Sequence, residues 1–210
     1  MKVDLKKELA GYRATRGRID LIDVPPARYL AMDADGGPEA EAFGAAIASL
    51  YPFAYALKFA SKRDLGRDYV VPPLEAWWWA DDMASFTTAR DASQWRSTVL
   101  LMIPEWVPNE LVDAARESVS AKVPPAHLAQ VRVELIDEGR CAQTLHVGPF
   151  ADEGPVIETL HEAIAAAGLV LAGRHHEIYL SDLRRTPAER LRTILRQPTS
   201  PAATAASETR

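Results

Sequence analysis

The sequence lacks several features that identify common classes of protein. It contains a single cysteine, Cys141, which excludes an internal disulfide and a zinc site built on a cysteine cluster. It has no run of about 18 apolar residues, and its first residues are charged rather than the apolar segment of a signal peptide. We therefore expect a cytoplasmic protein without a membrane span, in which Cys141 is a buried, unreactive thiol in a strand.

An excess of positive charge is also missing. Lysine and arginine number 24 against 29 aspartates and glutamates, and the formal net charge is −5. The densest basic stretch, residues 6–18, is interrupted by Glu8. Phosphate-binding surfaces need clustered lysine and arginine, so nucleic acid is not expected as a partner. Residues 1–18 are predicted to form a solvated, helical N-terminal extension.

Motifs for nucleotides, metals and nucleophilic serines are absent too. The chain has no P-loop, no G-x-S-x-G and no G-x-G-x-x-G pattern. His175 and His176 are adjacent in a predicted strand, so they face opposite ways and do not converge on one ion. The acids of "DADGGPEAE" lack the spacing of an EF-hand loop. We expect neither a metal nor a cofactor.

What the sequence does contain is an internal repeat. "IDLIDVPPARYLAMDADGG" and "VRVELIDEGRCAQTLHVGPF" each read as two strands joined by a turn. An amphipathic helix follows each, at about 38–51 and 153–167, with apolar residues at helical spacing. Two further strands complete each half, ending in "WRSTVLLMIP" and "RLRTILRQP".

This repeat predicts an α+β domain at residues 19–198, built of tandem pseudo-symmetric ββαββ units. The halves cover about 19–104 and 130–198, and a linking helix at about 108–122 joins them. Edge-to-edge fusion predicts one curved antiparallel sheet, with helices on one face and a concave ligand pocket on the other. Residues 199–210 are small, polar and proline-containing, which predicts a disordered tail.

Each half also places an acid two residues before an aromatic. "PLEAWWWA" carries Glu75 and Trp77, and "HHEIYLSD" carries Glu177 and Tyr179. A pocket for small molecules needs apolar walls and a few polar groups. Since alternate residues of a strand share a face, we predict one cleft lined from both halves. The residues predicted to line it are Glu75, Trp77, Trp79, Glu177 and Tyr179.

Three alternatives stay open at this point. Glu177 could instead be a solvated residue on an outer face or one arm of an ion pair. Trp78 should point away from the cleft and under the helices in a regular strand, whereas a bulge would turn it toward the cleft. Tyr55 could lend its phenol to the rim of the pocket, or it could simply pack.

Four stretches together resemble the standalone GyrI-like small-molecule-binding proteins: "LYPFAYALKF", "DYVVPPLEAWWW", "LHVGPF" and "HHEIYLSDLRRTPAERLRTILRQP". The resemblance extends from about residue 4 to 198. It implies the tandem-repeat fold and a glutamate at the pocket centre, here Glu177, with Tyr179 in the matching aromatic position. Ala76 stands where relatives have glycine, and Trp77 where they have an aliphatic residue. The identity of a substrate therefore does not carry over.

Relatives of this kind include drug-sensing domains of transcription regulators, a gyrase inhibitor, and hydrolases of cyclopropanoid antibiotics. The resemblance therefore leaves two main functions. In one, Glu177 activates water and the protein hydrolyses electrophilic, partly aromatic toxins. In the other, the pocket sequesters hydrophobic, possibly cationic, compounds without chemistry. Because the repeat begins near residue 19, no DNA-binding domain is expected, and nothing in the sequence directly supports gyrase inhibition. Oligomeric state stays open.

Overall fold

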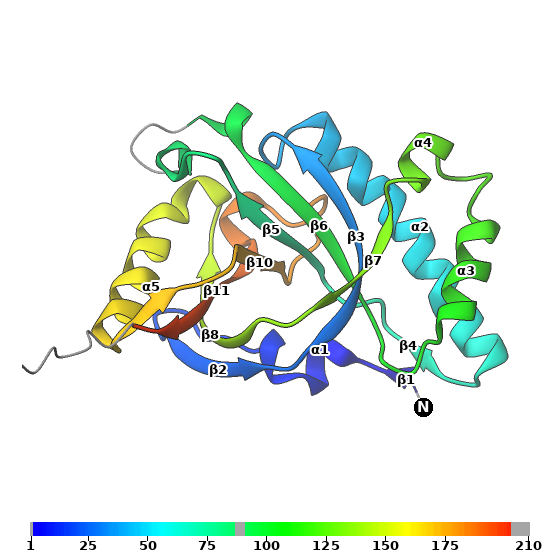
Figure 1. The fold of residues 1–210 in the computed structure, drawn as a ribbon, viewed down its shortest axis with the longest axis horizontal. Helices are drawn as coiled ribbons and strands as arrows, with labels where there is room; N and C mark the ends of the chain where they lie inside the picture. The colour runs from blue at the N-terminus through cyan, green and yellow to red at the C-terminus, as the bar shows by residue number, and fades with distance from the viewer. Residues whose placement is uncertain (1, 87–90, 203–210) are drawn as a thin grey trace, which may run out of the picture.

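The computed structural model describes residues 2–86 and 91–202 of the chain. A large antiparallel sheet dominates it (Figure 1). The strands are β1 (Lys2–Val3), β2 (Asp20–Val24), β3 (Ala27–Asp35), β4 (Asp68–Tyr69), β5 (Leu74–Trp79), β6 (Arg96–Ile103), β7 (Arg132–Ile136), β8 (Gly139–Val147), β9 (Leu169–Leu171), β10 (His175–Tyr179) and β11 (Arg192–Pro201). The α-helices are α1 (Leu5–Glu8), α2 (Glu41–Asp64), α3 (Asn109–Ser118), α4 (Pro125–Leu128) and α5 (Gly154–Ala166).

The order of strands across the sheet is β2-β8-β11-β10-β5-β6-β3-β7. The first half contributes β2, β3, α2, β5 and β6, and the second contributes β7, β8, α5, β10 and β11. The tandem ββαββ fold predicted from the sequence is confirmed. β5 and β10 pair at the middle of the sheet, where the two halves meet. β2 pairs with β8 and β3 pairs with β7, so the first strands of each half cross to the other half and the sheet curves strongly (Figure 1).

Both long helices cover the same face of the sheet. Phe43 of α2 stacks on Trp78 of β5, with ring centroids 5.3 Å apart. Leu160 and Ile164 of α5 pack with Leu195 of β11 in a second apolar cluster. We call this the helix face. It therefore carries two hydrophobic cores side by side, one under each helix, with the central strand β10 between them.

Helix α2 is longer than its sequence predicts. The expected helix ends near residue 51, but α2 extends to Asp64 and contains Pro52. An interior proline costs roughly 3 kcal/mol. The residues beyond it, Phe53 and Leu57, are almost fully buried, and each such side chain contributes about 1.5–3 kcal/mol. Burial therefore outweighs the proline. By length and composition alone α2 is apolar enough to span a membrane, but its buried side chains mark it as a core helix.

The two ends of the chain also differ from expectation. The N-terminal extension is helical only in α1 and in a 3-10 turn at Ala10–Tyr12, and it lies against the concave face of the sheet. At the other end, β11 continues to Pro201 and pairs with β9, so residues 199–201 belong to a strand rather than to a disordered tail. Residue 202 follows the strand, and residues 203–210 of the predicted tail lie outside the described residues.

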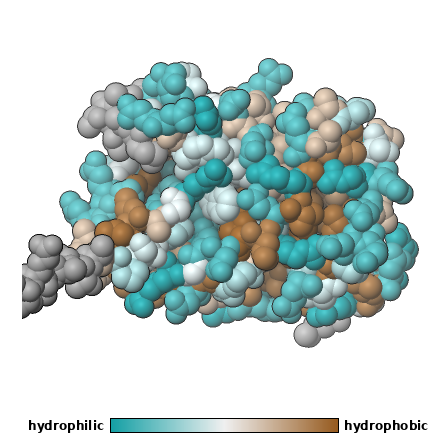
Figure 2. Space-filling view, in the orientation of Figure 1, coloured by the Kyte–Doolittle hydropathy of each residue, from teal (hydrophilic) through white to brown (hydrophobic). Residues whose placement is uncertain are grey.

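The surface shown in Figure 2 is largely hydrophilic, with smaller apolar areas between the charged groups. Among the exposed large apolar side chains are Val133 and Leu135 of β7, and Tyr55 and Phe59 on α2.

Candidate functional site

Glu177 lies at the middle of the sheet, on the helix face. Its neighbours across the ladder are Ala76 of β5 and Leu195 of β11. Ala76 belongs to the apolar cluster under α2, and Leu195 belongs to the cluster under α5. Directly paired residues of antiparallel strands share a face. The carboxyl group of Glu177 therefore separates two hydrophobic cores, a position at which an apolar residue would be expected.

Tyr179 bonds this carboxyl group, and Trp78 in turn bonds Tyr179. The Tyr179 hydroxyl donates a hydrogen bond of 2.8 Å to Oε2 of Glu177, and the Trp78 indole N–H donates one of 3.1 Å to the Tyr179 hydroxyl. Burial raises the pKa of Glu177 to about 7, while hydrogen bonds from Tyr179 and Trp78 and the charge of His176 act in the opposite direction. The group is thus poised between acid and carboxylate near neutral pH.

Tyr179 itself stays a neutral donor. Burial and the neighbouring charge of Glu177 raise the pKa of its phenol well above 10. Phe150 packs edge-on against the Tyr179 ring, with centroids 5.7 Å apart. The chain Trp78–Tyr179–Glu177 is therefore a directed hydrogen-bond relay that ends on a titratable carboxyl group.

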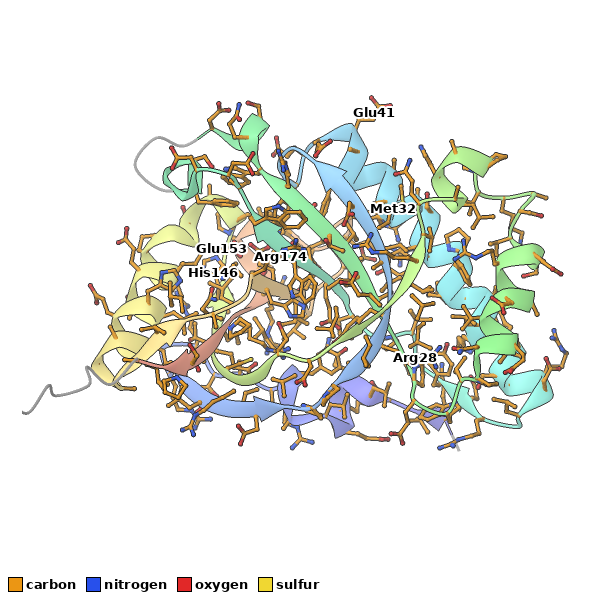
Figure 3. The ribbon with its side chains drawn as sticks, in the orientation of Figure 1. Arg28, Met32, Glu41, His146, Glu153 and Arg174 are labelled. Atoms are coloured by element: carbon orange, nitrogen blue, oxygen red, sulfur yellow. The ribbon has the colours of Figure 1, made fainter. Side chains whose placement is uncertain are left out.

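A pocket of about 680 Å³ opens beside this relay. Tyr179 lines it, and Phe150 and Leu183 complete that wall. The opposite wall is the segment that begins α2, where Glu41 is labelled in Figure 3. Glu177 lies one hydrogen bond behind the Tyr179 wall and keeps part of its surface accessible to solvent. The lining residues are Pro38, Glu39, Ala40, Glu41, Phe43, Gly44, Ala45, Ile47, Ala48, Phe150, Tyr179 and Leu183.

Sequence reasoning missed part of this wall. Phe43 lies in the first amphipathic helix and Phe150 ends the stretch "LHVGPF", and neither position carries a local pattern that marks a pocket residue. Glu153, just before α5, is only 5% exposed, and its charge is among the causes that raise the pKa of Tyr179. Figure 3 shows Glu153 and His146 on the α5 side of the sheet. An acidic residue just before a helix is ordinarily explained by its favourable interaction with the helix dipole. The sequence therefore contains no signal that Glu153 is buried.

The prediction that Glu75, Trp77 and Trp79 share a cleft with Glu177 is wrong. β5 and β10 are antiparallel, and their register pairs Glu75 with Ile178 and Trp77 with His176. Every odd-numbered residue of β5 therefore faces the same way as the even-numbered residues of β10. Both strands carry an acid two residues before an aromatic, but the register puts the two patterns on opposite faces. Trp78, which the sequence left undecided, is the tryptophan on Glu177's face.

The concave face holds a buried polar network instead of a pocket wall. His176 lies between two carboxylates, with Nε2 3.0 Å from Glu75 and Nδ1 2.9 Å from Glu138. Arg196 pairs with Glu138 at 2.8 Å, and the hydroxyl of Tyr12 donates to Glu75 at 2.6 Å. The pocket that Tyr179 lines is therefore on the helix face, and the N-terminal extension closes the opposite one.

The remaining predicted residues fall outside the pocket. Trp77 donates to Glu138 at 3.3 Å, and the guanidinium of Arg174 lies 3.7 Å from the ring centre of Trp79, both on the concave side. Tyr55 is 46% exposed on α2 and stacks between Tyr51 and Phe59. None of these side chains touches the relay in the part of the chain that the structure describes.

Other groups with metal-binding or nucleophilic chemistry include His175 and Cys141. Within residues 2–86 and 91–202, no group of three or more histidine, cysteine or acidic residues is arranged to hold a metal ion. Burial lowers the pKa of His175 to about 3, which keeps this ring neutral. Cys141 is fully buried, and burial raises the pKa of its thiol to about 12. A thiol with such a pKa is protonated and inert at neutral pH.

Comparison with known proteins identifies the family of the chain. The model of the GyrI-like small molecule binding domain matches residues 18–198. The chain belongs to the GyrI-like family. The resemblance noted in the sequence is thereby confirmed, and a small-molecule ligand is the family's common feature. No curated protein matches the chain.

Solved structures extend the comparison. An uncharacterized conserved protein from Listeria innocua is 35% identical, with a TM-score of 0.85, over 95% of this chain and all of that one. A hydrolase from Listeria innocua is 34% identical, with a TM-score of 0.81 and the same coverage. The EcmrR C-terminal domain shares the fold at 9% identity and a TM-score of 0.55, over 88% of this chain and 98% of that one.

Proposed function

We propose that this GyrI-like protein hydrolyses small, flat, electrophilic compounds, with Glu177 as the general base. The observation that carries the proposal is the Glu177 carboxyl group, which lies one hydrogen bond behind the Tyr179 wall of a largely apolar pocket and whose pKa burial raises to about 7. A general base works best when its pKa lies near the working pH. The similarity to a Listeria hydrolase at 34% identity supports the same reaction class.

The substrate class follows from the family resemblance and from the shape of the pocket. Phe43, Phe150 and Tyr179 present aromatic surface to a pocket of about 680 Å³, which suits a planar ligand of drug-like size. Among compounds handled by relatives, cyclopropanoids carry a strained three-membered ring conjugated to a ketone. This ring reacts with water in a single addition that needs no cofactor.

The reaction can be written as one balanced step. Ionised Glu177 takes a proton from a water molecule, and the oxygen of that water forms a bond to a cyclopropane carbon. The carbon–carbon bond of the ring breaks, and its electron pair moves through the conjugated system to the ketone oxygen. That oxygen becomes phenolate-like and takes up a proton, while Tyr179 donates a hydrogen bond to the water or to the developing negative oxygen. Binding in the pocket would hold the ring close to the water.

A second function has its own supporting observation. A carboxylate bonded to Tyr179, which itself contacts Trp78 and Phe150, also suits a hydrophobic cation, through charge pairing and cation–π attraction. A protein that works in this way binds and sequesters drugs without changing them. The two functions use the same residues and differ only in whether product appears.

Mass spectrometry distinguishes hydrolysis from sequestration. The purified protein is incubated with a duocarmycin-type cyclopropanoid, and the ring-opened product, heavier by one water, is followed over time. The proposed function predicts turnover above the buffer control. Tight binding with no product would instead establish sequestration.

A further inference from the structure

His176 is the immediate neighbour of Glu177 in β10, and its side chain points to the opposite face of the sheet. Its ring is completely buried, clamped between Glu75 at 3.0 Å and Glu138 at 2.9 Å. Burial acts to lower the pKa of His176, but the charges and hydrogen bonds of Glu138 and Glu75 outweigh it and raise the pKa to about 9. The ring is therefore an imidazolium at neutral pH.

The surrounding network is built to keep that charge in place. Arg196 pairs with Glu138 at 2.8 Å and also donates to the Gln143 side chain at 3.0 Å and to the Gly11 carbonyl at 2.6 Å. Two carboxylates thus face one imidazolium and one guanidinium, and the four charges cancel. Burying four charges is costly, and apolar residues of similar size often stabilise a protein at least as well. Stability alone is therefore a weak reason for the arrangement.

The groups around Glu177 show what the imidazolium adds. Tyr179 and Trp78 supply neutral hydrogen bonds, and His175, on the same face of β10, is an uncharged ring. The charge of His176 is the cationic influence that lowers the pKa of Glu177. The other titratable or charged groups near this part of the sheet include, on the helix face, Glu153 beside Tyr179, His146 of β8, His161 of α5, Glu39 and Glu41 at the pocket wall, and Asp182 and Arg184 after β10. On the concave face they include Glu138, Glu75 of β5 and Arg196 of β11.

We propose that His176 is a positioning residue for Glu177: held as an imidazolium by Glu75 and Glu138 on the concave face, it favours the ionised form of the carboxyl group on the helix face. The sheet is one backbone thick here, so two charges on consecutive residues interact across little but peptide groups. This inference rests on the proposed function for its importance to turnover, but the electrostatic coupling itself does not depend on any reaction.

The test measures the two ionisations directly. Histidine ring nitrogens are followed by ¹⁵N NMR in the unmodified protein, and glutamate carboxyl carbons by ¹³C NMR, with Glu177→Gln identifying the Glu177 signal. The His176 ring should stay protonated at pH 7. In His176→Asn, the pH at which Glu177 is half ionised should rise by about half a unit to one unit, since the charge of His176 acts together with stronger hydrogen bonds in lowering the pKa of Glu177.

A double variant keeps the test valid if His176→Asn alone fails to fold. His176→Asn leaves two buried carboxylates facing each other, whereas the double variant with Glu75→Gln removes one charge of each sign and relieves that repulsion. In this double variant the Glu177 midpoint should also rise. Tyr12→Phe is the matched control, because it breaks a hydrogen bond of the network but leaves all four charges, and it should leave the Glu177 midpoint unchanged.

The outcomes are distinct. A neutral His176 ring at pH 7, or a Glu177 midpoint that stays within about 0.2 units in both histidine variants, overturns the proposal. If the midpoint rises but the unmodified protein shows no turnover of a cyclopropanoid, the hydrolytic function fails and the coupling stands. If turnover is observed, its pH profile should move to higher pH together with the NMR midpoint in the variants.

Discussion

Tyr179 lies two residues beyond Glu177 on the same face of β10, and its hydroxyl donates a hydrogen bond of 2.8 Å to the Glu177 carboxylate. Tyr179 lines the pocket. Glu177 lies behind it, between β5 and β11. The pair is therefore the point at which the hydrophobic interior of the protein and a small-molecule pocket meet. The predictions below follow from this relationship.

Removing the Tyr179 hydroxyl should affect both turnover and ionisation. Tyr179→Phe keeps the ring and its packing against Phe150, but it deletes a donor to a charged group. We expect the pKa of Glu177 to rise by about one unit, and turnover to fall on the order of 10²-fold. A pH–rate profile measures both. Tyr29→Phe, near Glu75 on the concave face, is the control and should leave the profile unchanged.

Neutralising Glu177 should change stability in a pH-dependent way. Its folded pKa of about 7 lies above the ordinary value of 4.5, so folding favours the protonated acid. The penalty for ionisation is absent below pH 4.5, grows as the pH rises, and reaches roughly 3 kcal/mol above pH 7. In Glu177→Gln this penalty disappears. Urea unfolding should show no gain at pH 4 and a clear gain at pH 8. A structural ion pair would show the reverse, a loss of stability at pH 8.

His176 should make the protein sensitive to alkali. Its folded pKa of about 9 lies above the ordinary value of 6.5, so it contributes stability that is complete below pH 6.5 and lost as the pH rises through 9. The free energy of unfolding should therefore decline from pH 6.5 to 9.5 by roughly 3 kcal/mol. In His176→Gln this dependence should be absent, while His127→Gln, a partly exposed histidine of α4, should keep it. An equally steep decline in His176→Gln would contradict the account.

Gly44 offers a way to close the pocket without harming the fold. It lies in α2, lines the pocket, and a Cβ atom added there meets no atom within 4 Å. Gly44→Ala should stabilise the protein by about 0.5–1 kcal/mol, because glycine is a poor helix former. Gly44→Phe should fill the pocket and weaken ligand binding at least tenfold without lowering the melting temperature. Tyr55→Ala, outside the pocket, should bind ligand normally, and the pocket would be misplaced if this variant lost affinity instead.

The sequence was sufficient for the architecture because each element carries its own periodicity. Alternation of apolar residues and the turn residues between strands identified both halves, and the stripes of α2 and α5 placed both helices on one face. Glu177 and Tyr179 were found in the same way, since residues two apart in one strand share a face. Each of these inferences depends only on the spacing of residues close together in the sequence.

What the sequence could not supply was the register between β5 and β10. Glu75 and Glu177 are 102 positions apart, and a change of one residue in that pairing moves Glu75 to the other face. No turn joins these two strands to fix the offset. The role of Glu153 was hidden for a similar reason, because its burial depends on how α5 docks on the sheet rather than on any local pattern.

The most direct test of the account compares Glu177→Gln with the unmodified protein in the ring opening of a cyclopropanoid, with binding of the same compound measured by fluorescence or calorimetry. We predict that turnover falls on the order of 10²–10⁴-fold, the usual contribution of a general base, while affinity for a neutral flat ligand changes by less than about threefold. Turnover that survives the substitution, or a loss of affinity as large as the loss of turnover, would contradict the assignment of Glu177 as the base.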